Sequence, residues 1–260
     1  MASSTDAVRG SYDSMAPVYD RFTAHHDYDA WTASLEAFAI GHGLRGTRLL
    51  DAGCGTGKSF LPFLARGYAV TAFDVSPAMA AAAAAKAPAA RVHVHDLRTV
   101  PVLGAFDLVC CLDDCLNHLL EPRELTEAFR RLAANLAPGG VLVFDVNTLA
   151  TYRTFFAELS VDQSPALVLV WNGETPPGMP PSSTATASFV AYSAAEDGRW
   201  HATTLTHRQR HYGRAEVGAA LAAAGLEAVA VRGQGLDGAA VPELDELVHT
   251  KAVYIARHAR

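Results

Sequence analysis

The sequence predicts an α/β protein whose mostly parallel sheet carries helices on both faces. Short apolar runs, the size of buried strands, alternate with helical segments between residues 47 and 145, as in sheets covered on both sides. A glycine-rich turn, DAGCGTG, follows the first run at residues 51–57. Each of the five runs ends on or next to an acidic residue. Because ligands bind outside the carboxyl ends of parallel strands, we expect a binding site at this edge.

The composition is that of a globular protein with a large apolar core. Of the 260 residues, 50% are hydrophobic and 18% are charged, which argues against extensive disorder. The formal net charge of −6 argues against nucleic acid as a partner, because such binding depends on Lys and Arg side chains that neutralise phosphates. We therefore expect a small-molecule partner.

The cysteines form no disulfide or metal pattern. Cys110, Cys111 and Cys115 crowd into one short window, where neighbours on a strand and its following turn pair poorly. The spacing also lacks the tight triplet that an iron–sulfur cluster needs. We expect free thiols, no bound metal and a reducing, cytoplasmic location. Neither the polar N-terminus nor the Ala-rich run at residues 78–90 has the pattern of a signal or a membrane span, so no membrane association is expected.

The elements of the first half follow from apolar periodicity and from helix signals. A helix over residues 29–43 comes first. Ser76 is a suitable N-cap for a later helix, with Pro77 in its first turn, where proline is tolerated. The predicted strands are 47–51, 69–73, 91–95, 106–112 and 141–144, and further helices are expected at 61–65 and 124–136.

After residue 147 the pattern changes to longer strands with alternating polar residues, which is typical of antiparallel hairpins. A helix at 214–224 ends at Gly225, a common C-cap. The strands are predicted at 167–171, 184–192 and 200–212, with a loop at 173–183, and two last strands at 227–231 and 252–256. We predict a single domain over residues 1–260, made of N-terminal lid helices (1–45), a cofactor-binding core (46–147), an antiparallel cover (148–212) and a last helix with two strands (213–260).

The glycine-rich turn allows two interpretations. The run AGCGTGKS at residues 52–59 fits a relaxed phosphate-binding loop, in which Lys58 would reach the terminal phosphates of a nucleotide. Three carboxylates favour a cationic nucleoside instead. Asp51 next to the glycines would repel a triphosphate, Asp74 ends the second strand where an acid accepts ribose hydroxyls, and Asp96 ends the third near the place of an adenine amino group. S-adenosylmethionine, with its ammonium and sulfonium, suits this edge.

Taken together, the motifs resemble those of class I S-adenosylmethionine-dependent methyltransferases. The matching runs, in order, are LLDAGCGTG (49–57), FDVSPAM (73–79), HDL (95–97), DLV (107–109) and LAPGG (136–140). The resemblance covers roughly residues 11–147, and the two last strands are similar to the reversed pair of the family. It implies a Rossmann-like, seven-stranded, mostly parallel sheet with one antiparallel strand. It also implies S-adenosylmethionine as the cofactor and S-adenosylhomocysteine as a product.

On this resemblance, the glycine turn holds the methionine part of the cofactor. Gly53, Cys54 and Gly55 would approach it through their backbone, and Asp51 would orient the turn from behind. Asp74 would accept the ribose hydroxyls. The remaining contacts are divided between the two ends of the cofactor: Val75 and Met79 would flank the adenine, Asp96 and Leu97 would meet its edge, and Leu112 and Asp113 would contact the amino end.

Residues 12–20, YDSMAPVYD, are similar to a lid found in small-molecule members of the family. In that lid a tyrosine reaches the carboxylate of the cofactor. Tyr12 and Tyr19 are seven residues apart, so they share a helical face. We expect both in the cofactor site, with Tyr28 and Trp31 as an extension of the aromatic wall.

Methyl transfer from a sulfonium is an in-line displacement, so the acceptor atom must be unprotonated and lie about 3 Å from the methyl carbon. An amine needs little help in losing its proton, whereas a hydroxyl needs a general base such as histidine. The run DDCLNH at 113–118 follows the fourth strand and borders the methyl group in this fold. The candidate catalytic residues are Asp113, Asn117 and His118 from this run, with His207 and His211, which share a face of a predicted strand with Gln209.

The segment 148–212 is similar to the antiparallel cover of bacterial small-molecule methyltransferases, including amino-sugar N-methyltransferases. Its aromatic residues would cover an apolar or sugar-like acceptor, and the alternative is a homodimer interface. We expect N-methylation of a sugar amine in natural-product biosynthesis. The alternatives are O-methylation of a phenol or hydroxyl acceptor, an RNA-directed or non-catalytic relative of the fold and, most remote, a P-loop NTPase.

Overall fold

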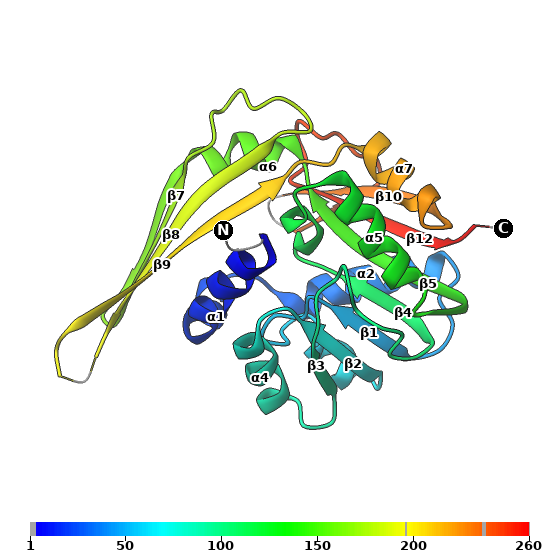
Figure 1. The fold of residues 1–260 in the computed structure, drawn as a ribbon, viewed down its shortest axis with the longest axis horizontal. Helices are drawn as coiled ribbons and strands as arrows, with labels where there is room; N and C mark the ends of the chain where they lie inside the picture. Colours follow the sequence, from blue (N-terminus) through cyan, green and yellow to red (C-terminus); the bar gives the residue numbers. More distant parts are fainter. Residues whose placement is uncertain (1–3, 196, 236–237, 260) are drawn as a thin grey trace.

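The structure, a computed structural model, describes residues 4–195, 197–235 and 238–259. It contains a central sheet and a second, antiparallel sheet that extends from it (Figure 1). The central sheet has the strand order β11-β10-β12-β5-β4-β1-β2-β3. Its strands are β1 (Arg48–Ala52), β2 (Ala69–Asp74), β3 (Arg91–Val94), β4 (Phe106–Cys111), β5 (Leu136–Asn147), β10 (Leu226–Gln234), β11 (Ala240–Val241) and β12 (Lys251–His258).

The central sheet has the predicted mixed topology. β1 pairs in parallel with β2 and β4, β2 pairs with β3, and β4 pairs with β5. β12 is antiparallel to both β5 and β10, and the short β11 is antiparallel to β10. This confirms the predicted fold class, to which the two-residue β11 adds a short edge strand.

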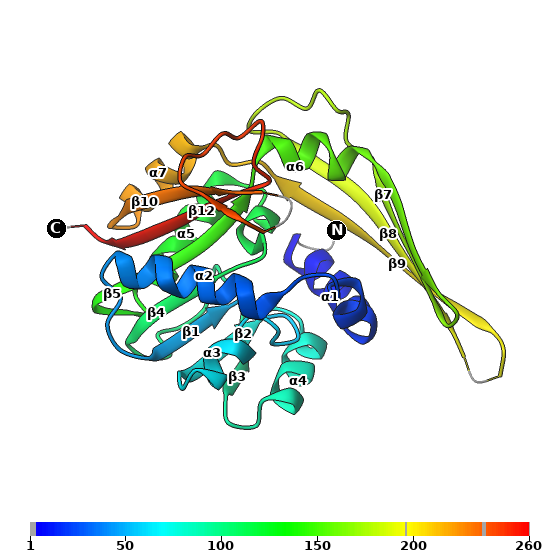
Figure 2. The ribbon, with the colours of Figure 1, turned by 180° about the vertical axis from the view of Figure 1, so that it is seen from behind.

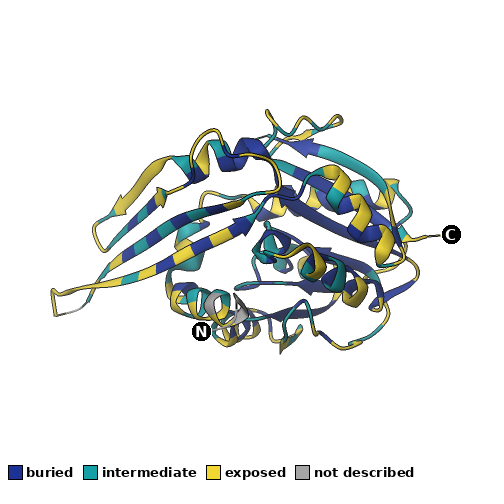
Figure 3. Ribbon diagram, turned by 45° about the horizontal axis from the view of Figure 1, so that its top comes forward, coloured by how far each residue is buried: buried dark blue, intermediate teal, exposed yellow. Residues whose placement is uncertain are grey.

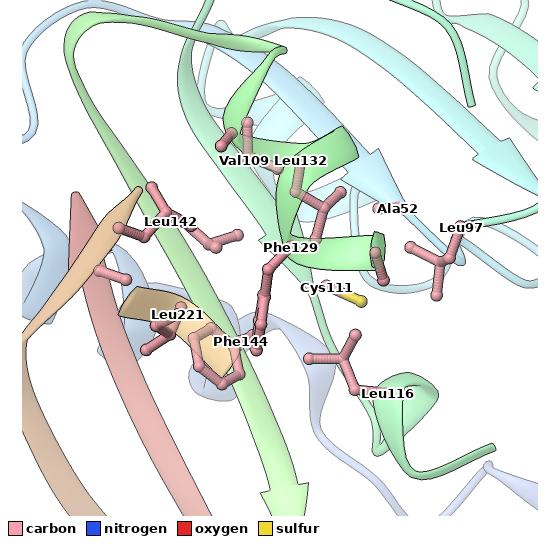
Figure 4. Packing of buried hydrophobic residues seen from close by; sticks show 14 of the residues in the cluster. Ala52, Leu97, Val109, Cys111, Leu116, Phe129, Leu132, Leu142, Phe144 and Leu221 are labelled. Atoms are coloured by element: carbon pink, nitrogen blue, oxygen red, sulfur yellow. The ribbon is translucent and has the colours of Figure 1, made fainter. Parts of the chain in front are cut away.

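Helices cover both faces of this sheet (Figure 2). Successive residues of a strand point to opposite faces, so β4 contributes side chains to the hydrophobic cores on both faces of the sheet. Leu108 and Cys110 join the core that includes α2 (Tyr28–Gly41), α3 (Leu61–Ala65) and α4 (Pro77–Lys86). Val109 and Cys111 join the core under α5 (Pro122–Ala133) and α7 (Arg214–Ala223), shown in Figure 4.

The second sheet lies over the first helix. α6 (Leu149–Arg153) and the 3-10 turn η2 (Phe155–Ala157) lead into it from β5. α1 (Ser4–Phe22) contacts both α4 and the second sheet (Figure 1), and burial alternates along the strands that face it (Figure 3). The strands, in the order β6-β7-β8-β9, are β6 (Leu159–Ser164), β7 (Leu167–Gly173), β8 (Thr184–Ala194) and β9 (Trp200–Arg210).

The prediction misses β6 and shortens β5. The β6 sequence LSVDQS has no sustained apolar alternation and is largely exposed, and the strand is held by its pairing with β7. α5 begins at Pro122, before the predicted residue 124, because Glu121 and Glu124 form a capping box at its start. Leu159 and Val161 of β6 are exposed; the homodimer expected through this sheet stays a prediction.

Two other expectations concern the whole chain. All four cysteines are free thiols, as predicted. Among the described residues, no helix combines the length and apolarity that crossing a membrane requires.

Candidate active site

A tight turn joins β1 to the segment before α3. Gly53 and Gly55 adopt left-handed backbone conformations, with φ of 77° and 52°, which glycine tolerates best. A Cβ atom at Gly53 would overlap Sγ of Cys115. The N–H groups of Gly53 and Cys54 donate to the Phe73 carbonyl at 2.8 and 3.0 Å, so the turn is bound to the end of β2.

Two buried carboxylates support this turn. Oδ2 of Asp51 accepts a hydrogen bond from the Ser59 hydroxyl at 2.5 Å, and burial raises the pKa of Asp51 to about 7. Asp74 accepts from the backbone N–H groups of Gly55 and Ser76, both at 2.8 Å. Burial raises the pKa of Asp74 to about 6. The Val75 backbone also donates to Asp74, and because the two carboxylate oxygens have about four lone-pair sites, the group can still accept from a ligand.

A first cavity opens at the carboxyl edge of the sheet, beside Asp74. It brings together most of the residues expected around a cofactor, and its lining carries three aspartates. The residues that line it are Val8, Tyr12, Tyr19, Gly53, Gly55, Phe73, Asp74, Val75, His95, Asp96, Leu97, Arg98, Leu112, Asp113, Cys115, His118 and Leu119.

A second cavity adjoins the first and shares Val8, Tyr12 and His118 with it. It runs between the start of α1 and β9, which is the edge strand of the second sheet. Its lining mixes apolar and polar residues and, in the described part of the chain, carries no carboxylate. It comprises Val8, Gly10, Ser11, Tyr12, His118, Leu120, Thr204, Leu205, Thr206, His207 and Arg208.

Tyr12 and His118 form the partition between the cavities. The Tyr12 hydroxyl lies 2.9 Å from Nε2 of His118, and the His207 ring centroid lies 6.0 Å from that of His118. Burial lowers the pKa of His118, although Asp114 and a hydrogen bond to the Arg208 backbone act in the opposite direction. Burial also lowers the pKa of His207, to about 3. Both imidazoles are therefore neutral near pH 7.

A buried lysine joins three carboxylates at the rim of the first cavity. Nζ of Lys251 lies 2.7 Å from Asp145, 2.9 Å from Asp114 and 3.4 Å from Asp113. Burial alone would lower the pKa of Lys251, but the three carboxylates outweigh it and raise that pKa. Tyr28 donates to Asp113 at 2.7 Å. Sequence reasoning missed Lys251, which lies on the last strand, far from any motif.

Polar contacts hold α1 against the glycine turn. Asp13 accepts from the Ser76 hydroxyl at 2.6 Å, and Asp20 accepts from the Thr56 hydroxyl at 2.5 Å. Lys58, which a phosphate-binding loop would direct to a nucleotide, instead donates to the carbonyl and hydroxyl of Thr23 at 2.8 and 2.9 Å. Thr23 directly follows the end of α1, so this contact ties the helix end to the turn. Tyr12 and Tyr19 are thereby held at the first cavity, with ring centroids 6.4 Å apart.

The site can now be compared with known proteins. A family profile for the methyltransferase domain matches residues 49–140. The chain is 30% identical over 208 residues to a protein of Geobacillus sp. (strain WCH70) whose name assigns it, without a substrate, to the methyltransferases; the match covers 78% of this chain and 83% of the relative. The chain belongs to the S-adenosylmethionine-dependent methyltransferases.

This methyltransferase is also similar to proteins that are named as sugar N-methyltransferases. It is 34% identical over 120 residues to the dTDP-3-amino-3,6-dideoxy-alpha-D-glucopyranose N,N-dimethyltransferase of Streptomyces fradiae, covering 46% of this chain and 47% of that protein. The sugar N-methyltransferase KedS8 from Streptoalloteichus sp. superposes with a TM-score of 0.72 at 25% identity, covering 93% of each chain. A methyltransferase from Clostridium acetobutylicum shares the fold, with a TM-score of 0.79 at 18% identity over 96% of this chain and 99% of that chain.

The first cavity of the methyltransferase fits S-adenosylmethionine. A left-handed glycine turn lets the backbone approach a ligand closely, and Asp74 and Asp113 give the cavity an acidic wall that suits a cationic cofactor. Bound there, the cofactor supplies a methyl group on a sulfonium. Asp96 also lines the cavity, but its carboxylate is held by Arg98 at 2.6 Å. Arg98 was not anticipated, and no motif other than its place directly after HDL marks it.

Three of the residues predicted around the cofactor, Asp51, Cys54 and Met79, do not line the cavity. Met79 is fully buried and packs with Met15 in the core beneath the second sheet, so its expected position flanking the adenine is wrong. The reason is that Ser76 caps α4 and accepts from the Met79 N–H at 3.1 Å, which turns this side chain toward α1. The Cys54 side chain is buried in the core of the opposite layer, and Asp51 is buried, where it accepts a hydrogen bond from Ser59.

Two predicted catalytic residues belong to the scaffold. Asn117 is fully buried; it donates to the Arg210 carbonyl at 2.8 Å and accepts from the Asn147 N–H at 2.9 Å, which joins β9 to β5. His211 lies outside both cavities, with Nδ1 accepting from the Ser182 N–H at 3.2 Å and Nε2 at 3.3 Å from Glu246. His207 and His118, by contrast, do meet at the second cavity.

Proposed function

We propose that this enzyme transfers the methyl group of S-adenosylmethionine to the amino group of a small, hydroxylated acceptor, a sugar amine, in natural-product biosynthesis. One observation carries the proposal. The cofactor cavity and the second cavity share Tyr12 and His118, so a methyl group on one side would meet an acceptor on the other. The second cavity is therefore the proposed acceptor groove.

On the cofactor side, the proposed contacts follow the cavity lining. Asp74 would accept the ribose hydroxyls through the lone pairs that its backbone donors leave free. Val75 and Leu97 would border the adenine. Leu112 and Asp113 would meet the ammonium group, and Tyr19 the carboxylate.

On the acceptor side, the proposed roles rest on proton affinity. The acceptor nitrogen must be neutral when it attacks the methyl carbon. His118 is kept neutral by burial, so the Nε2 lone pair, beside the Tyr12 hydroxyl, can take a proton from an ammonium group. Because burial lowers its pKa, His118 is a weaker base than the ordinary histidine that a hydroxyl acceptor would need, yet it suffices for an amine. This favours N-methylation over O-methylation.

The acceptor groove supports a hydroxylated, anionic acceptor. Ser11, Thr204 and Thr206 are among the residues that line it. Arg208 is also among the lining residues, which include no carboxylate in the described part of the chain, and guanidinium groups bind phosphate or carboxylate well. The relatives named for dTDP-amino sugars have acceptors of this chemistry.

The competing functions lack comparable support. Lys58 and Ser59, which a phosphate-binding loop would need, donate to Thr23 and Asp51. A net charge of −6 gives an RNA-directed enzyme little electrostatic attraction. A cytoplasmic location stays a prediction.

An acceptor panel tests the proposal. The purified enzyme is incubated with S-adenosylmethionine and with matched pairs of amino sugars and their hydroxyl analogues, free and nucleotide-linked, and methylated products are identified by mass spectrometry. We expect a mass gain of one or two methyl groups on amines, and Arg208→Gln to reduce use of the anionic acceptors about tenfold. The exposed Arg91→Gln is the control. Methylation of the hydroxyl analogues or of tRNA, with none on amines, would contradict the proposal.

A further inference from the structure

Gln209 lies beneath the partition between the two cavities, with 2% of its surface exposed. Its Nε2 donates to Oδ2 of Asp114 and lies 3.3 Å from Nε2 of His118. Its Oε1 accepts from Nδ2 of Asn147 at 3.0 Å and from the Tyr152 hydroxyl at 3.2 Å. Both ends of the amide are thus engaged.

These partners determine which way the amide points. Asp114 is paired with Lys251, whose Nζ lies 2.9 Å from Oδ1, and a carboxylate can only accept hydrogen bonds. The opposite amide orientation would set Oε1 of Gln209 against this carboxylate and Nε2 against the amide donor of Asn147. The –NH₂ group of Gln209 therefore faces Asp114 and His118.

A donor facing Nε2 of His118 requires a lone pair on that nitrogen. The Tyr12 hydroxyl, 2.9 Å away, can donate to the same atom. The ring also makes a hydrogen bond to the Arg208 backbone that favours its protonated form. Such a bond is accepted by a carbonyl, and Nδ1 is the nitrogen left to donate it.

We propose that Gln209 is a positioning residue that holds His118 as the neutral tautomer with its proton on Nδ1, so that the Nε2 lone pair faces Tyr12 and the acceptor groove. The tautomer exists without any acceptor; only its role in methyl transfer rests on the proposed function. Lys251, Asp114 and Gln209 form the chain of contacts that imposes it.

The groups that face His118 come from three elements. Tyr12 lies on α1, and His207 lies on β9, 5.9 Å from the Tyr12 ring and 6.0 Å from the His118 ring. Asp114, with Lys251 behind it, lies before η1 (Cys115–His118). Asp114 favours a proton on His118, whereas burial opposes it. The Gln209 amide opposes it too, because a donor at Nε2 stabilises only the neutral ring.

The intact protein tests the tautomer directly. Nitrogen-15 NMR of the histidine side chains, with S-adenosylhomocysteine present and His118 assigned by comparison with His118→Ala, distinguishes Nδ1–H from Nε2–H. We expect His118 to carry its proton on Nδ1 at pH 7. A proton on Nε2, or a doubly protonated ring, would overturn the inference, whatever acceptor the enzyme uses.

Two substitutions test the part of Gln209. Gln209→Glu replaces the donor by an acceptor, so the NMR titration midpoint of His118 should rise by about one pH unit. In Gln209→Met, which has neither an amide nor a carboxylate, the midpoint should lie between those of the parent and Gln209→Glu. The acid limb of kcat should move with it, while the affinity for S-adenosylhomocysteine changes less than threefold. Gln163→Glu, on the exposed β6, is the matched control. A folded Gln209 variant whose His118 titrates as in the parent enzyme would refute the proposal. If His118 carries its proton on Nδ1 but the enzyme methylates no amine, only the proposed function is refuted.

Discussion

Nζ of Lys251 lies 2.7 Å from Oδ2 of Asp145, whose side chain is fully buried. Asp145 also accepts hydrogen bonds from the backbone N–H groups of Asp113 and Asp114, at 2.7 and 2.9 Å. Both of these residues have left-handed backbone, with φ of 62° and 53°, which is costly for residues other than glycine. The ion pair therefore holds a strained turn at the rim of the cofactor cavity.

Replacing this lysine should destabilise the enzyme. Lys251→Met leaves buried carboxylates without a counter-charge, and we expect the free energy of unfolding to fall by about 3–5 kcal/mol. Urea denaturation measures it. The control is Lys86→Met, which removes the more exposed ion pair with Asp20 and should cost about 0–1 kcal/mol. Equal losses in the two variants would show that the Lys251 cluster contributes no more than a surface pair.

Asp74 should matter for cofactor affinity. Asp74→Ala removes a charged acceptor for the ribose hydroxyls, worth about 1.5–3 kcal/mol, so calorimetry should show roughly ten- to hundredfold weaker binding of S-adenosylhomocysteine. Asp107→Ala is the matched control, because Asp107 pairs with Arg48 at the opposite end of the sheet. Unchanged affinity in the Asp74 variant would remove it from the proposed ribose site.

Substitution of His118 should impair catalysis, whereas substitution of His211 should impair stability. His118→Ala should lower kcat at pH 7 by about a hundredfold, within the usual range for a general base, and change the affinity for S-adenosylhomocysteine less than threefold. His211→Ala breaks contacts with Ser182 and Glu246, so it should lower the melting temperature and leave kcat at 25 °C close to that of the parent. Equal losses of turnover and cofactor affinity in His118→Ala would place that residue with the cofactor instead.

His207 should make the enzyme less stable in acid. Burial holds its folded-state pKa at about 3, against about 6.5 in the unfolded chain. Between these values only the unfolded state binds the proton, so stability is full above pH 6.5 and falls as the pH drops toward 3. The contribution is at most about 1.4 kcal/mol per pH unit.

In the variant His207→Phe, the free energy of unfolding should no longer fall in this way as the pH drops below 6.5. Urea denaturation at pH 7, 6 and 5 measures it, with His201→Phe as the control, since His201 is exposed on the same strand. If the parent and His207→Phe lose stability in parallel below pH 6.5, His207 is not the group responsible.

Much of the cofactor site could be predicted because its parts are local to their strands. The glycine turn and Asp74 each directly follow an apolar run, and parallel topology brings the carboxyl ends of those runs to one edge. Met79 shows where this reasoning stops. It lies within a matching motif, yet its side chain turns away, because the packing of α1 against α4 decides which face of that helix is buried.

The acceptor side could be predicted only in part. Strand alternation placed His207 and Gln209 on one face. It did not reveal what faces them, because Asp114 lies 95 residues before Gln209 and Lys251 lies 137 residues after Asp114. His211, two residues beyond Gln209, lies past the end of β9 and bonds elsewhere.

The sequence alone therefore determined the α/β fold, the position of the cofactor edge and the family, since periodicity, turn chemistry and strand-end acids act over a few neighbouring residues. Only the tertiary structure decided which polar groups meet at the reaction centre. The second sheet must first fold over α1 before Gln209 reaches His118, and β12 must insert between β5 and β10 before Lys251 reaches Asp145. These contacts depend on how distant elements pack, and no local pattern encodes them.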